Sequence, residues 1–261
     1  MSHSRFFVHT FAAAVAVTSV FGSVPVAGAT PGPVPPTTTC QLPVFGPGST
    51  YHPHIDPADF TPNVDNPLFP LTPGTTLVYS GFKDGEAALD LFAPSTRTKV
   101  IDGVTTRVVE DRLFLDGFLE ERTSDYYAQD RCGTVWYFGE DTAELDRRGH
   151  VISTEGSFHA GVDGAEPGVF MQAHPEVGRL LRQEWYPGHA EDIFAAVDLH
   201  TAVAVPYGRF QNALRTAETT ALEPGVLDNK YYVPGIGQVE EVAVTGRARG
   251  SFWSTCSPEP A

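Results

Sequence analysis

Alternation of apolar and polar residues dominates the chain between residues 76 and 138. Segments 76–81, 87–93, 96–101, 105–115 and 118–129 each alternate or nearly so, and short turns with Asp-Gly or Pro-Ser separate them. A period of two is typical of a strand with one buried face, and Asp-Gly between two such segments is a hairpin signal. The pattern predicts an antiparallel meander.

The densest run of aromatic and acidic residues spans residues 125–141 and predicts a hairpin. Strand-forming aromatic residues flank a turn at 130–133, where Gly133 can take a positive φ. Closure of this hairpin brings Asp125 near Glu140 and Asp141. The rings mainly fill the core, and the three acids border whatever site the protein has.

Strand patterns resume in the second half, at 181–186, 190–198, 199–205, 210–222, 229–233, 238–244 and 248–253. No long amphipathic helix occurs, although 175–181 suits one short helix. We therefore predict a mainly β fold: an antiparallel curved sheet, half-barrel or open barrel, with an extended N-terminal arm and long loops. Residues 75–261 are expected to form a single β domain.

The N-terminal residues predict export. Arg5 precedes an apolar run at 11–21, and Ala27-Gly28-Ala29 fits a cleavage site, so residues 1–29 are interpreted as a signal peptide. Residues 30–74 are rich in Pro, Thr and Gly and predict an extended arm. We expect a secreted, extracellular protein without membrane insertion, because no other segment is long and apolar enough to span a bilayer.

The charge balance limits the kinds of molecule that the protein can bind. The chain has 32 Asp and Glu against 17 Lys and Arg, a net charge of −15. Nucleic acids and anionic membrane surfaces are excluded because no basic stripe exists to bind them. Cationic ligands and metal ions remain open. The oligomeric state is not predictable from these data.

Three cysteines, an odd number, predict one disulfide and one remaining thiol in an exported chain. We favour Cys40 with Cys256, which ties the arm to the last strand. Pairing of Cys132 with either of the other two is the alternative.

Potential metal ligands and acid–base groups gather between residues 155 and 192. They are His159, Asp163, His174, Glu184, His189, Glu191 and Asp192. His159, His189, Glu191 and Asp192 are the candidate catalytic residues, and His159, His174, His189 and Glu191 are the candidate ligands of a divalent metal ion. No metal-specific spacing, serine-nucleophile elbow or phosphate-binding loop accompanies them.

A concave sheet face lined by rings and carboxylates suits a small or amphiphilic ligand. We expect Trp136, Phe138 and Trp185 to contact it and Glu140 to orient it. Ligand binding is the favoured function. An extracellular metal-dependent hydrolase or lyase using the 155–192 region is the first alternative, and an interaction or cell-wall-associated protein without a small-molecule site is the second.

Three stretches carry a resemblance: NPLFPLTPGT at 66–75, DYYAQD at 125–130 with GTVWYFGED at 133–141, and KYYVPGIGQVE at 230–240. They resemble motifs of a family of exported bacterial, actinobacterial-type proteins of uncharacterised function. The third stretch is also loosely similar to the end of lipoprotein-carrier-like proteins, which implies a half-barrel. The resemblance assigns no catalytic residues.

Overall fold

The computed structural model describes residues 41–245 and 251–254, which belong to one compact unit, Cys40–Ala261. The described residues form strands and two 3-10 turns, η1 (Gly48–Thr50) and η2 (Pro57–Asp59), and no α-helix. The first strands are β1 (Phe60–Thr61), β2 (Leu77–Lys83), β3 (Glu86–Ile101), β4 (Val104–Leu115), β5 (Phe118–Asp130), β6 (Val135–Leu145), β7 (Val151–Ser153) and β8 (Phe158–His159). They are followed by β9 (Glu166–Met171), β10 (Leu180–Arg182), β11 (Glu184–Trp185), β12 (Asp192–Val205), β13 (Gly208–Thr220), β14 (Leu227–Val233), β15 (Gly237–Thr245) and β16 (Ser251–Ser254).

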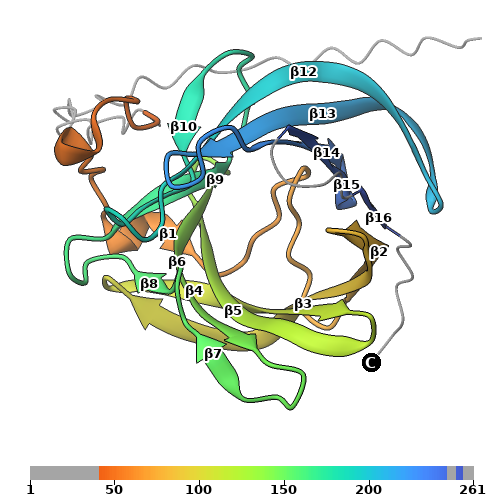
Figure 1. Ribbon diagram of the computed structural model, residues 1–261. Coiled ribbons are helices and arrows are strands. Elements are labelled where there is room, and N and C mark those ends of the chain that lie inside the picture. Colours follow the sequence, from red (N-terminus) through yellow and green to blue (C-terminus); the bar gives the residue numbers. More distant parts are fainter. Residues whose placement is uncertain (1–40, 246–250, 255–261) are drawn as a thin grey trace, which may run out of the picture. The chain divides into compact units, whose positions relative to one another are not determined.

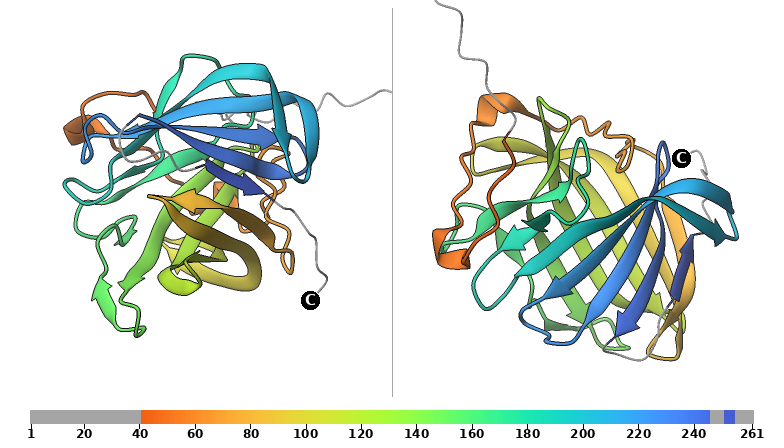
Figure 2. Two further views of the ribbon diagram at one scale, coloured as in Figure 1. Left: turned by 45° about the vertical axis from the view of Figure 1, so that its right-hand side comes forward. Right: turned by 90° about the horizontal axis from the view of Figure 1, so that it is seen from above.

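The strands form one curled antiparallel sheet, in the order β10-β12-β13-β14-β15-β16-β2-β3-β4-β5-β6-β9-β11. Figures 1 and 2 show the sheet curving round on itself. The two edge strands of the sheet, β10 and β11, are neighbours in the chain and are separated only by Gln183. β10 pairs with β12 at one edge, and β11 pairs with β9 at the other. The predicted mainly β half-barrel is confirmed.

Most predicted strands exist, with three differences, of which the first is that the segment 181–186 forms two strands, β10 and β11. The segments 87–93 and 96–101 form one strand, β3, whose pairing with β4 shifts register between Pro94 and Thr98. Likewise, 190–198 and 199–205 form β12, which also carries register shifts. The predicted helix at 175–181 is wrong: this segment contains turns and the start of β10.

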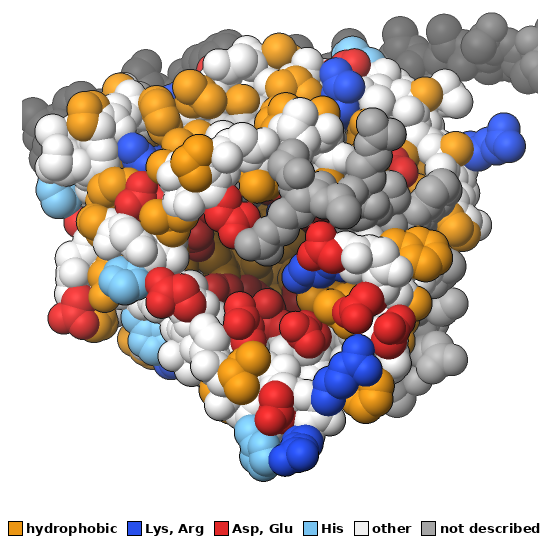
Figure 3. Space-filling model, viewed as in Figure 1, with side chains coloured by type: hydrophobic (Ala, Val, Ile, Leu, Met, Phe, Trp, Pro, Cys, Tyr) orange, Lys and Arg blue, Asp and Glu red, His pale blue; other side chains and the backbone are white. Residues whose placement is uncertain are grey.

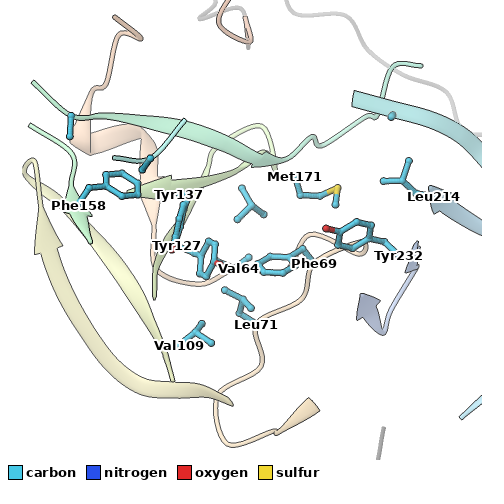
Figure 4. Packing of buried hydrophobic residues seen from close by; sticks show 14 residues of the cluster. Val64, Phe69, Leu71, Val109, Tyr127, Tyr137, Phe158, Met171, Leu214 and Tyr232 are labelled. Atoms are coloured by element: carbon cyan, nitrogen blue, oxygen red, sulfur yellow. The ribbon is translucent and has the colours of Figure 1, made fainter. Parts of the chain in front are cut away.

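The inner face of the sheet encloses a core that is completed by the N-terminal arm. Phe69 and Leu71 are buried with Tyr127 of β5 and Tyr232 of β14. Figure 4 shows Phe69 between these two tyrosines. Because β5 and β14 are far apart in the sheet order, the sheet must curl round the arm to make these contacts. The arm thus occupies part of the concave face.

A second core covers the outer face of the same strands. Tyr126, Trp136 and Phe138 are buried there with Leu42 and Phe60 of the arm packed against them. The Phe60 ring lies edge-on to both Trp136 and Phe138, with centroids 5.9 and 5.3 Å away. The predicted arm therefore belongs to the β unit and packs on both faces of its sheet.

Of the three cysteines, the structure describes only Cys132. Cys40 and Cys256 lie outside the described residues, but Cys132 is disulfide-bonded. Its partner is not among the described residues, so the pairing of the three cysteines stays a prediction.

The predicted signal peptide, residues 1–29, also lies outside the described residues. Within the described ranges, no helix is long and apolar enough to cross a membrane.

Candidate functional site

A bulge in β6 decides which side chains reach the inner face. Tyr127 pairs with Tyr137, but its neighbour Tyr126 pairs with Gly139, so β6 has an extra residue at this point. Side chains of a regular strand alternate between faces, and a bulge resets that alternation. Tyr137 and Glu140, three residues apart, consequently both face inward.

Glycine is required in this bulge. Gly139 has a φ of 138°, and a Cβ there would lie 2.1 Å from the carbonyl oxygen of Phe158. Such close approach of two backbones is a reason to find glycine inside a strand. It allows β8 to pair with β6 through Gly139 with His159 and Glu140 with Phe158.

The bulge also corrects the predicted ligand contacts. Trp136 and Phe138 are buried in the outer core, not on the concave face. Trp185 lies against Gly48 of the arm, and its ring is 4.3 Å from the Arg182 guanidinium. Of the four predicted ligand-binding residues, Glu140 alone faces inward. The rings on the inner side include those of Phe69, Phe92, Tyr127, Tyr137, Phe158, Phe170, Tyr186 and Tyr232.

Tyr137 joins two carboxyl groups on the inner face. Its Oη lies 2.7 Å from Oδ1 of Asp125 and 2.8 Å from Oε2 of Glu140. A phenol has one proton to donate. When Tyr137 donates it to one carboxylate, the other carboxyl group must be protonated to form its own bond to Oη. The predicted approach of Asp125 to Glu140 is confirmed, and the Tyr137 hydroxyl lies within hydrogen-bond distance of both carboxyl groups.

Burial is the largest cause of the raised pKa values of Asp125 and Glu140. It raises the pKa of Glu140, and the Asp125 carboxylate raises it further. The pKa of Asp125 is raised by burial and then by Asp111, while its bond to Tyr137 opposes the shift. Desolvation disfavours a charged carboxylate, and a second negative charge nearby adds to the effect.

The acidic surface continues along the inner face. Burial raises the pKa of Asp90, Asp111, Glu184 and Asp192 as well. Figure 3 shows a hollow in this side of the molecule with Asp and Glu side chains gathered round it. Lys230 supplies a cation, 2.8 Å from Glu218. The Oδ1 atom of Asp90 is buried and has no hydrogen-bond partner.

A pocket of about 220 Å³ reaches Glu140 beside β6 and β8. Its lining combines three carboxylates, two aromatic rings and a histidine: Glu140, Asp141, Ser157, Phe158, His159, Val162, Asp163, Ala165 and Tyr186. It brings together residues singled out from the sequence, among them Glu140, His159 and Asp163. We treat this pocket, which we call the β6–β8 pocket, as the candidate site.

Asp141 and His159 form the outer wall of the pocket. His159 Nε2 lies 2.9 Å from Oδ1 of Asp141, and Lys99 Nζ lies 2.9 Å from its Oδ2, which also accepts a bond from the Tyr126 hydroxyl. Burial alone would raise the pKa of Asp141, but the bonds from Tyr126 and Lys99 and the charge of His159 lower it. The lowered pKa keeps Asp141 ionised at neutral pH.

The predicted metal ligands do not converge. His189 pairs with Glu155 at 2.9 Å and stacks on Tyr186, while Glu191 accepts a bond from the Gly188 amide. His174 lies exposed after β9. Among the described residues, no group of three or more His, Cys, Asp or Glu side chains is arranged to hold a metal ion. The predicted site of His159, His174, His189 and Glu191 is thus not assembled.

No protein-family model matches the chain, and no curated protein matches it. Two solved structures have a similar fold. One is a protein from Bacteroides fragilis NCTC 9343 described as exported and as having a YmcC-like fold: 11% identity, 72% of this chain and 96% of that chain covered, TM-score 0.40. The other is described as a lipoprotein of Parabacteroides distasonis ATCC 8503: 10% identity, 71% and 94% covered, TM-score 0.36. Likeness this low carries no function to this chain.

Sequence reasoning missed Tyr137 and Tyr186 as site residues. Alternation along an unbroken strand puts Tyr137 and Glu140 on opposite faces and so gives no reason to pair them. The signal that could have found the bulge is Gly139 between an aromatic run and an acidic pair, since glycine inside a strand pattern often marks a bulge.

Proposed function

We propose that this is an exported binding protein whose β6–β8 pocket holds the cationic group of a small amphiphilic ligand. The observation that carries the proposal is the set of carboxyl groups without a cation of their own. Among the described residues, no ion pair involves the buried Asp125, the half-buried Glu140 or the exposed Asp163. A buried carboxylate that lacks a cation is unfavourable, and a ligand cation relieves this cost.

The rings of the pocket suit the same ligand. Phe158 and Tyr186 lie beside the carboxylates, and an aromatic face attracts an alkylammonium group. The adjoining inner core contributes apolar surface through Phe158 and Tyr137, whose ring centroids are 5.6 Å apart. A cation with a short apolar chain matches both parts, whereas an anion would meet Glu140, Asp141 and Asp163.

Binding of a cation should release a proton. Asp125 and Glu140 hold a proton between them because burial raises both pKa values. A cation beside Glu140 favours its ionised form and lowers its pKa. The shared proton then leaves to solvent, so the heat of binding depends on the ionisation enthalpy of the buffer.

Titration calorimetry with decyltrimethylammonium below its micelle concentration tests the proposal. We expect saturable binding with proton release near neutral pH, and about tenfold or weaker affinity after Glu140→Gln, a loss of about 1.4 kcal/mol. The control is Glu176→Gln, which removes an equal charge from an exposed side chain paired with Arg179.

Two results would count against the proposal. The first is that the wild-type protein does not bind the probe; the second is that Glu140→Gln and Glu176→Gln behave alike. Absence of binding to cationic, neutral and anionic probes would favour an interaction or cell-wall-associated protein. The metal-dependent enzyme has no assembled ligand set in support, and we do not advance it.

A further inference from the structure

A second and larger cavity lies on the outer face of the sheet. It measures about 460 Å³ and is lined by Thr96, Arg97, Thr98, Lys99, Val108, Ser124 and Tyr126. None of these residues lines the β6–β8 pocket. The volume falls in the range of small-molecule sites. We call it the outer pocket.

The outer pocket exists because β3 departs from regular pairing. Its register with β4 shifts between Pro94 and Thr98, so residues 95–97 have no ladder partner. Ser95 stabilises the departure: its hydroxyl donates to the carbonyl of Val108 at 2.8 Å and accepts a bond from the Arg97 amide at 3.2 Å. Irregularities of this kind re-aim side chains near functional sites. Here they place Thr96, Arg97 and Thr98 around an opening over β4 and β5.

The lining is rich in hydroxyl groups and cations. Thr96, Thr98, Ser124 and Tyr126 contribute hydroxyls, and Arg97 and Lys99 contribute positive charge. The floor is apolar, with Val108 and the buried ring of Tyr126. Hydroxyls around an apolar floor suit a ligand that has both hydrogen-bonding edges and nonpolar faces, as a sugar ring does.

Positive charge exceeds negative charge at this place, in contrast to the rest of the chain. Arg97 and Arg112 both contact the Glu110 carboxylate, and Lys99 pairs with Asp141. Arg97 and Lys99 are the charged residues of the lining and both are positive, whereas the whole chain has a net charge of −15. Locally, the outer pocket favours an anion.

Arg97 has unused donors for that anion. Its side chain is 64% exposed, and its one contact to an acid runs through Nη2 to Glu110. No hydrogen bond from its Nε or Nη1 to a described residue is present. A guanidinium presents several donors in a planar fork that matches a carboxylate. Lys99, in comparison, already contacts Tyr126, Asp141 and His159.

We propose that the outer pocket binds a sugar acid, with the carboxylate on Arg97 and the ring hydroxyls on Thr98 and Ser124. The opposite charge of its ligand distinguishes this site from the β6–β8 pocket. The inference does not rest on the proposed function, because the two pockets share no lining residue.

Backbone amide shifts measured by NMR during titration with D-glucuronate test the inference, with D-glucose as the uncharged probe. We expect saturable shifts at Thr98 and Ser124 with glucuronate and at least tenfold weaker binding of glucose. Arg97→Gln should weaken glucuronate binding about tenfold, and Ser124→Ala should weaken it severalfold. The matched control is Arg147→Gln, an exposed arginine that pairs with Glu86 outside the pocket.

The inference is overturned if glucuronate produces no saturable shifts at the outer pocket, or if Arg97→Gln binds it as Arg147→Gln does. Equal binding of glucose and glucuronate also overturns it, since the carboxylate then contributes nothing. Binding of decyltrimethylammonium, measured on the same variants, reports separately on the β6–β8 pocket.

Discussion

Tyr137 is the residue through which the inner acids are arranged. Its hydroxyl lies between Asp125 and Glu140, and its ring is buried beside Tyr127, with centroids 4.8 Å apart. The Tyr137 ring packs in the core, and its hydroxyl lies within hydrogen-bond distance of two carboxyl groups, between which it can pass a proton. Its position explains how Asp125 and Glu140 are accommodated without a cation: they are held as a hydrogen-bonded, partly protonated group.

Removing this hydroxyl tests its contribution. Tyr137→Phe keeps the ring but leaves Asp125 and Glu140 without their common partner. We expect the free energy of unfolding to fall by about 1–3 kcal/mol, the usual penalty for an unsatisfied buried polar group. Urea denaturation measures it, and Tyr207→Phe, at an exposed tyrosine, should be near neutral. Equal stability of the two variants would contradict the proton-sharing arrangement.

At the scale of elements, the β5–β6 hairpin shows how far pattern reasoning reaches. Its strands and a turn at residues 130–133 are predicted from alternation and from Gly133; the structure has both strands and places the turn one residue later, between Asp130 and Val135. The faces of Trp136 and Phe138 were predicted wrongly relative to Glu140, because one inserted residue exchanges the two faces beyond it. Alternation identifies strands locally, but it does not report a bulge that depends on a distant strand such as β8.

Gly139→Ala should disrupt this arrangement. The added Cβ would overlap the Phe158 carbonyl, and the φ of 138° is unfavourable for alanine. We expect β8 to separate from β6 and stability to fall by about 2–4 kcal/mol. Gly149→Ala is the control: Gly149 also has a positive φ, of 82°, but a Cβ there meets nothing within 4 Å, so a loss of about 1 kcal/mol is expected. Thermal and urea unfolding compare the two, and similar losses would show that the contact with β8 is unimportant.

At the scale of the molecule, the acidic inner surface links stability to pH. Raised pKa values recur at Asp111, Asp125, Glu140 and Glu184, and burial raises the pKa of Asp228 to about 6. A carboxyl whose pKa is higher in the folded state binds protons preferentially there. Its stabilising effect is complete below the unfolded-state pKa and is lost as pH rises through the folded-state value.

The protein should therefore unfold at a higher temperature at about pH 5 than at about pH 8. Below about pH 4 the trend reverses, because carboxylates with lowered pKa values, such as Asp141, lose their bonds on protonation. Calorimetric melting across this range measures the profile. Asp125→Asn with Glu140→Gln, which imitates the protonated pair, should flatten it between about pH 5 and 8, and an unchanged slope would locate the proton linkage elsewhere.

The curled sheet was predictable from strand count and turns, but the site was less so. His159 and Glu140 were identified by residue type, yet their meeting depends on the pairing of β8 with β6. His174 and His189 were identified in the same way and lie apart from them. Residue spacing predicts which side chains lie on the same face of one strand. It does not predict which distant loops the curled sheet brings into contact.

The arm that packs inside the sheet has a consequence for the order of folding. Phe69 belongs to the same buried cluster as Tyr232 of β14, and the Pro67 carbonyl accepts a bond from the Gly235 amide at 2.6 Å. These partners are separated by most of the described chain. Contacts of such long sequence separation form late and slow folding, because the chain entropy is lost before the contact is gained. A growing chain can pack Phe69 on Phe92, Tyr127 and Phe170, but the enclosure of Phe69 and Leu71 is complete only after β14 has been synthesised.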